Sequence, residues 1–237
     1  MRARQEGTEE EPKAPAKPEP PAGRASRIQV SGYVQSELRS DQASDPQTEF
    51  RVRRARLEFV APMGEVAGVV LKVDAAEGIE TRDAYVQVRS GEAAYLRLGQ
   101  TKVPFMYEVL ESSSDRLEPE RTVLATTPTL FPGQRDVGLW AHLKQPLGEA
   151  APGATLGLGV MNGAGPNTGD NNTTKDWVAR LRFALGGRPV NKKTEANSVY
   201  LAVLKGRFTD AGGVTTDRER VGSGSPTSPG PCGCGVR

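Results

Sequence analysis

Arginines at alternate positions of one short stretch give this chain its clearest chemical signal. Residues 51–60 read Arg-Val-Arg-Arg-Ala-Arg-Leu-Glu-Phe-Val, and from Arg54 onward charged and apolar residues alternate strictly. Successive side chains of an extended strand point to opposite faces, so Arg54, Arg56 and Glu58 share one face. Rings of positive side chains are a physical basis of anion selectivity. The stretch therefore predicts a strand face that attracts anions.

The same separation of charged and apolar residues recurs along most of the chain. The positive residues on the polar faces of predicted strands are Arg54, Arg56, Lys72, Arg97, Arg180 and Arg182. A face of this kind on a soluble sheet would be wetted, with the apolar face buried. However, no second hydrophobic layer or covering helix is apparent in the sequence to bury that apolar face. Closing the sheet into a barrel with its apolar face toward lipid removes this difficulty.

The strands that would carry these residues follow one another between residues 27 and 209. We expect about nine, near residues 28–38, 51–60, 69–74, 83–89, 95–100, 137–144, 155–161, 177–185 and 199–208. Alternating short turns and longer loops join them, which is typical of an antiparallel meander. Gly157 and Gly159 are expected to relieve crowding in a strongly curved strand. The fold class predicted is all-β, an antiparallel transmembrane barrel.

Three segments lie outside this pattern. Residues 1–26 are rich in proline and charge and are predicted to be disordered, without the apolar stretch of a secretory signal. Residues 101–135 contain four prolines and a possible short helix at Tyr107–Arg116. Residues 210–237 are predicted to be a disordered tail. The two cysteines of this tail, Cys232 and Cys234, are poorly spaced for a mutual disulfide and too few for a zinc site.

Composition excludes several functional classes. The net charge of the 237 residues is only +2, which is too balanced to argue for nucleic acid as a partner. No run of about 18 apolar residues exists, which argues against membrane helices. His142 is the only histidine, and it is expected to be structural or to face a lumen. No nucleophile elbow, phosphate loop or metal-binding histidine pair occurs, so we predict no enzymatic activity, cofactor or metal.

Several motifs, taken together, carry a family resemblance. They are Phe50-Arg-Val-Arg-Arg-Ala-Arg-Leu-Glu-Phe59, Lys72-Val-Asp-Ala75, Asp83-Ala-Tyr-Val86, Leu96-Arg-Leu-Gly-Gln-Thr-Lys-Val-Pro-Phe105, Pro119-Glu-Arg121 and Arg135-Asp-Val-Gly138. In order and spacing, over roughly residues 28–208, they resemble the phosphate-selective porin O and P family. The resemblance implies a trimeric barrel of roughly sixteen strands in the outer membrane of a Gram-negative-type bacterium, passing phosphate or similar small anions.

The resemblance also implies roles for particular residues. The stretch from Lys102 to Arg135 corresponds to a loop folded into the barrel as a constriction. The pore-lining residues expected from it are Arg54, Arg56, Lys72, Arg97, Lys102, Arg121 and Arg135. Among them, Arg121 and Arg135 are expected at the narrowest zone. The partners implied are outer-membrane lipid, small anions and, for a full-length chain, two further copies in a homotrimer.

Two observations keep an alternative open. About nine strands are too few for the family's barrel, and an open sheet leaves two unpaired edges that lipid does not tolerate. We therefore predict that the chain represents the N-terminal portion of a porin, truncated or altered near residue 209. The alternative is a soluble secreted or periplasmic β-sandwich binding module, whose apolar faces would form a dry core between two sheets.

Overall fold

Ten antiparallel strands form one sheet in which each strand pairs with the next along the chain. The computed structural model describes residues 28–40, 48–114, 121–126, 134–145, 153–185 and 198–225. The strands are β1 (Gln29–Ser40), β2 (Thr48–Met63), β3 (Ala67–Asp74), β4 (Glu80–Ser90), β5 (Ala94–Lys102), β6 (Arg135–Gln145), β7 (Ala154–Met161), β8 (Asp176–Ala184), β9 (Ser198–Thr209) and β10 (Thr215–Gly224). The predicted all-β antiparallel fold is confirmed.

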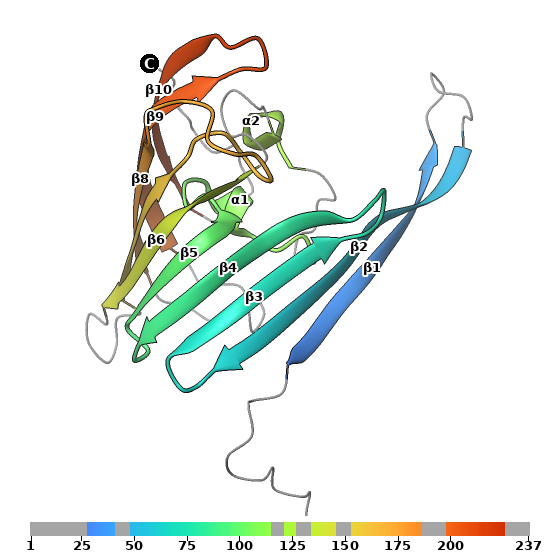
Figure 1. Cartoon of the computed structure of the whole chain (residues 1–237), viewed down its shortest axis with the longest axis horizontal. Coiled ribbons are helices and arrows are strands. Elements are labelled where there is room, and N and C mark those ends of the chain that lie inside the picture. The colour runs from blue at the N-terminus through green and yellow to red at the C-terminus, as the bar shows by residue number, and fades with distance from the viewer. Residues whose placement is uncertain are drawn as a thin grey trace, which may run out of the picture.

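The sheet curls, and two short helices lie inside the curve (Figure 1). These are α1 (Tyr107–Leu110) and α2 (Val123–Thr126), both in the connection between β5 and β6. Tight turns join β2 to β3 and β4 to β5, where Gly64 and Gly91 adopt positive φ values of 68° and 61°. In the described part of the chain, β1 pairs only with β2 and β10 only with β9. The sheet described here is thus an incomplete barrel of the porin type.

The last strand corrects the sequence-based reading. The prediction that no regular structure follows residue 209 is wrong for β10, which pairs with β9 from Thr215 to Gly224. Val221 is the only large apolar residue in β10, so no apolar alternation marks it as a strand. The hairpin turn instead rests on Asp210, whose Oδ1 accepts bonds of 2.9 Å from the backbone amides of Gly212 and Val214. The predicted extension at residues 1–26 and both cysteines lie outside the described residues.

The two faces of the sheet are inverted relative to those of a soluble protein. Apolar side chains on the outer, convex face are exposed: Val34 at 66%, Leu98 at 64% and Trp177 at 62%. On the inner, concave face, Arg54 and Arg135 are 8% and 2% exposed. A soluble sheet would bury the apolar set and expose the arginines. An outward apolar band and a polar interior are the pattern of a transmembrane barrel.

An apolar cluster occupies part of the inner face. The connection between β5 and β6 contributes Val103, Phe105, Met106, Val109 and Ala125, and β6–β9 contribute Trp140, Met161, Val178, Tyr200, Ala202 and Leu204. The expectation that no second apolar layer exists is therefore wrong for this half of the sheet. The covering residues stand in a proline-containing stretch without a strand or helix period, so the sequence pattern does not show them as a layer.

Two glycines make room for the aromatic residues of this cluster. A Cβ at Gly159 would lie 2.4 Å from Cε3 of Trp140, and one at Gly222 would lie 3.0 Å from Cε1 of Phe105. The crowding expected at Gly159 is thus present, and its source is the Trp140 ring. No helix in the described residues has the length and apolar character needed to cross a membrane.

Candidate anion site

Five arginines surround a cavity of about 520 Å³ beside the middle of β2 and the connection between β3 and β4. We call this the arginine pocket, and it is lined by Arg53, Arg54, Arg56, Arg82 and Arg121 together with Asp74, Glu77 and Glu80. The five guanidinium groups outnumber the three carboxylates and leave a net charge of +2. A guanidinium presents a rigid fork of N–H donors that suits oxyanions. The pocket therefore favours anions over cations.

Two β-bulges place arginines in the pocket that regular alternation would exclude. In the pairing of β1 with β2, Gln35 lies opposite Arg54 and Ser36 opposite Val52, so Arg53 is an extra residue. In the pairing of β3 with β4, Lys72 lies opposite Asp83 and Val73 opposite Thr81, so Arg82 is an extra residue. A bulge redirects side chains locally. As a consequence, two pairs of consecutive residues have both side chains on the inner face: Arg53 with Arg54, and Arg82 with Asp83.

Neighbouring polar groups hold the β2 arginines in position. Arg54 donates from Nη1 to Oε1 of Gln35 at 2.7 Å. Arg56 donates from Nε to Oδ2 of Asp74 at 2.8 Å and from Nη1 to the hydroxyl oxygens of Tyr33 at 3.0 Å and Ser113 at 2.9 Å. Since Ser113 belongs to the β5–β6 connection, Arg56 ties that connection to the wall of the sheet.

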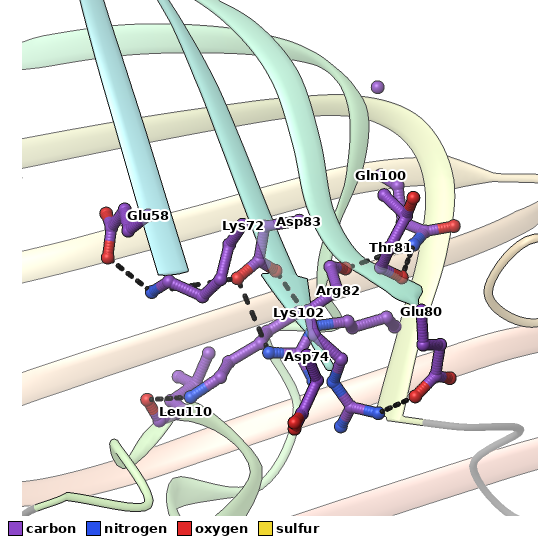
Figure 2. A network of polar contacts seen from close by, with 12 residues as sticks. Glu58, Lys72, Asp74, Glu80, Thr81, Arg82, Asp83, Gln100, Lys102 and Leu110 are labelled. Carbon is purple, nitrogen blue, oxygen red and sulfur yellow. Dashed lines mark hydrogen bonds and ion pairs between the residues drawn. The ribbon is translucent and has the colours of Figure 1, made fainter. Parts of the chain in front are cut away.

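A network of alternating charges adjoins the pocket (Figure 2). Lys72 lies between two carboxylates, with its Nζ 2.7 Å from Oε2 of Glu58 and 3.9 Å from Oδ2 of Asp83. Asp83 also accepts a bond of 2.8 Å from Nε of Arg135, whose side chain is only 3% exposed. Asp83 and Arg135 are buried, and each has an opposite charge beside it, which offsets the cost of removing both from water.

Two further positive residues bind backbone carbonyl groups of the β5–β6 connection. Lys102 donates to the carbonyl oxygens of Leu110 at 2.9 Å and Glu111 at 2.8 Å (Figure 2). Arg121 donates to the carbonyl oxygens of Glu108 at 3.1 Å and Glu111 at 3.2 Å. These carbonyls follow α1 or belong to it and would otherwise lack donors at the helix end. Lys102, on β5, therefore fixes α1 against the inner face, and Arg121 ties α1 to a later part of the same connection.

Arg97 lies apart from the pocket, nearer the short-turn end of β5. It donates from Nε to Oε1 of Gln87 at 2.8 Å. Its Cζ lies 4.5 Å and 4.6 Å from the ring centroids of Tyr85 and Tyr95. Tyr95 in turn stacks on His142 with centroids 4.5 Å apart. Farther round the same face, Arg180 lies 4.4 Å from the ring centroid of Tyr200.

The structure thus distributes the seven expected pore-lining residues over three places. Arg54, Arg56 and Arg121 line the arginine pocket, Lys72, Lys102 and Arg135 belong to the adjoining polar contacts, and Arg97 stands alone. Sequence reasoning missed Arg53 and Arg82. The sequence contains a signal for Arg53. Val52 and Leu57 both face outward, with 45% exposure each, although they are five residues apart and regular alternation would place them on opposite faces. Such a phase change within one strand requires an extra residue.

The connection expected as a constriction, residues 101–135, begins at residue 103 and ends at residue 134 in the structure. Its described parts cross the inner face, because Gln35 on β1 and Arg56 on β2 both bond to Ser113. The helix expected at 107–116 spans only Tyr107–Leu110. In the described ranges, no cluster of three or more His, Cys, Asp or Glu side chains is placed to hold a metal ion.

The sequence profile of the family described as "Phosphate-selective porin O and P" matches residues 28–208, which include strands β1 to β8 and nearly all of β9. The chain belongs to this family. Its members are outer-membrane porins, which are channels and not enzymes. A search of curated proteins gave no match. Family membership agrees with the exposed apolar outer face and the charged inner face described above.

Proposed function

We propose that the chain lines a path for passive diffusion of small anions, such as phosphate, across the outer membrane. The observation that carries the proposal is the arginine pocket, with its net charge of +2 on the inner face. Positive groups on a lumen wall lower the electrostatic barrier for an anion and raise it for a cation. No bond is made or broken in the solute during passage.

Placement of the pocket beside the β5–β6 connection supports the proposal. Arg121 brings a charge from this connection to the charges on β2 and β4, so an anion in the pocket would contact both the wall and the inserted segment. Neighbouring carboxylates keep the pocket from binding an anion too firmly. Asp74 pairs with Arg56, and Glu80 pairs with Arg82 at 2.9 Å. Conduction requires binding weak enough for the ion to leave.

The test is ion selectivity in planar lipid bilayers, measured as reversal potential across a potassium chloride gradient. Arg53→Gln and Arg82→Gln are the best variants, because the bulges place both residues in the pocket while neither carries the Ser113 contact. A unit charge about 7 Å from the ion, at an effective dielectric constant of about 40, is worth about 1 kcal/mol. Each substitution raises the barrier for an anion by about this amount and lowers the barrier for a cation equally, so the anion-to-cation permeability ratio should fall by about thirtyfold.

The matched control is Lys205→Gln, which removes one positive charge from the outer face of β9. Lys205 pairs with Glu219 at 2.7 Å, and its side chain is 78% exposed. Its loss should leave selectivity unchanged because it does not border the pocket. Cation selectivity of the unaltered chain, or unaltered selectivity in the double variant of Arg53 and Arg82, would refute the proposal.

A further inference from the structure

A second group on the inner face has the features of an anion site and lies outside the arginine pocket. Arg97 is partly exposed, and in the described part of the chain its side-chain partners are one amide, from Gln87, and two phenol rings. None of these partners is negatively charged. Its positive charge is therefore left unbalanced locally, unlike that of Arg56 or Arg135, which pair with Asp74 and Asp83.

The two tyrosine rings determine how Arg97 can meet a ligand. Cζ of Arg97 lies over both rings, within 4.6 Å of the centroids of Tyr85 and Tyr95, so the two rings limit the directions from which a ligand can approach the guanidinium group. Gln87 occupies the Nε donor. The two terminal nitrogens have no hydrogen-bond partner in the described residues and are not buried. What remains available is one edge of the fork, with parallel N–H donors.

The surroundings keep this edge in a fixed orientation. Tyr95 is held from the neighbouring strand by the His142 ring, with an interplanar angle of 18°. Gln87 lies directly opposite Arg97 in the pairing of β4 with β5. A guanidinium held by two cation–π contacts and one hydrogen bond loses little further freedom when it binds. The fork is thus prepared before a ligand arrives.

From this geometry we propose that Arg97, with Tyr85, Tyr95 and Gln87, forms a second anion site that takes small monocarboxylates. A planar carboxylate matches one fork edge through two parallel hydrogen bonds. One fork edge with two donors suits the single carboxylate group of a monoanion, whereas the five arginines of the arginine pocket suit a more highly charged oxyanion. The inference rests on the proposed function only for the route by which the ligand arrives, through the lumen.

The test uses para-fluorobenzoate, titrated into the full chain refolded in detergent micelles and followed by fluorine NMR line broadening. Arg97→Gln should lower the association constant by about tenfold, since both charge-assisted bonds are lost. Arg97→Lys keeps the charge but not the planar fork, so its loss should be intermediate. Arg89→Gln is the matched control, because Arg89 lies opposite Tyr95 in the sheet and is exposed. It should change binding by less than about twofold.

Each alternative result is decisive. Equal binding by wild type and Arg97→Gln, or an equal loss in Arg89→Gln, would overturn the site. Binding by Arg97→Lys equal to wild type would overturn the role of the planar fork. If Arg97→Gln does not fold, the Arg97→Lys variant provides the test of the site by itself. Displacement of the probe by inorganic phosphate at lower concentration than by benzoate would overturn the preference for monocarboxylates. Binding of the probe together with cation-selective bilayer currents would refute the proposed function and leave the site standing.

Discussion

The β5–β6 connection covers two parts of the inner face through two different kinds of contact. Against β1, β2 and β5 the contacts are polar, through Ser113 and through carbonyl groups that accept bonds from Lys102. Against β6–β9 they are apolar, with Phe105 and Val109 among the residues packed near Trp140. Apolar packing needs no matching partner for each atom, whereas each buried charge needs its own counterpart.

This difference separates anchoring from function on one face. The apolar half fixes the segment through side chains that carry no charge. The polar half holds the arginine pocket, where the charges are satisfied in pairs and yet leave an excess of positive charge. A segment fixed only by hydrogen bonds to mobile side chains would position Arg121 poorly. The apolar contacts therefore help to position Arg121 in the arginine pocket, although they do not line the pocket themselves.

The comparison predicts the largest loss of stability when the apolar cluster that holds the β5–β6 connection, here called the apolar anchor, loses a large side chain. Trp140 is 0% exposed in the cluster, whereas Trp177, the other tryptophan, is 62% exposed on the outer face. Trp140→Ala should lower the free energy of unfolding by about 4 kcal/mol, through lost burial and the cavity left behind. Urea unfolding in lipid vesicles measures this. Trp177→Ala is the control, and a loss there as large as for Trp140→Ala would contradict the assignment of inner and outer faces.

A smaller loss is expected when one member of a buried charge pair is neutralised. Asp83→Asn removes the carboxylate beside Arg135 and leaves that guanidinium, 2% exposed, without its counter-charge. The free energy of unfolding should fall by about 3 kcal/mol. The control is Asp217→Asn, which breaks the pair with Arg207 where the side chains are 77% and 51% exposed. That change should cost less than about 1 kcal/mol. Similar losses in both variants would mean that burial does not determine how much these ion pairs contribute to the free energy of unfolding.

The smallest effect should come from loosening the polar attachment of the segment. Ser113→Ala removes the hydroxyl oxygen that accepts a bond from Arg56 and leaves the apolar anchor intact. One hydrogen bond to a charged group is worth about 1.5 kcal/mol at the lower limit. Single-channel recordings should show increased current noise from a less firmly held segment, with selectivity retained. A loss of stability as large as that of Trp140→Ala would overturn the proposed division between anchor and pocket.

Alternation in the sequence was enough to predict nine of the strands and the face that carries Arg54 and Arg56. The alternation of side chains with a period of two is a property of each strand by itself, so it can be recognised in the sequence without knowledge of tertiary contacts. The bulges at Arg53 and Arg82 were not predicted, since an extra residue is defined only by its pairing with a neighbouring strand. The packing of Phe105 was missed for a related reason, because nothing near residue 105 in sequence points to Gly222.

The order of the strands also bears on how the chain folds. Every strand pairs with its neighbour in sequence, so each addition to the sheet closes only the connection between two adjacent strands. Loop-closure entropy grows slowly with length, and local pairings of this kind form fastest. The bond between Gln35 and Ser113 is of another kind, since 78 residues separate its partners. The β5–β6 connection is therefore expected to dock on the inner face only after strands β1 and β2 have paired with their neighbours. Before that step, the partly assembled sheet would have an inner face not yet covered by this connection.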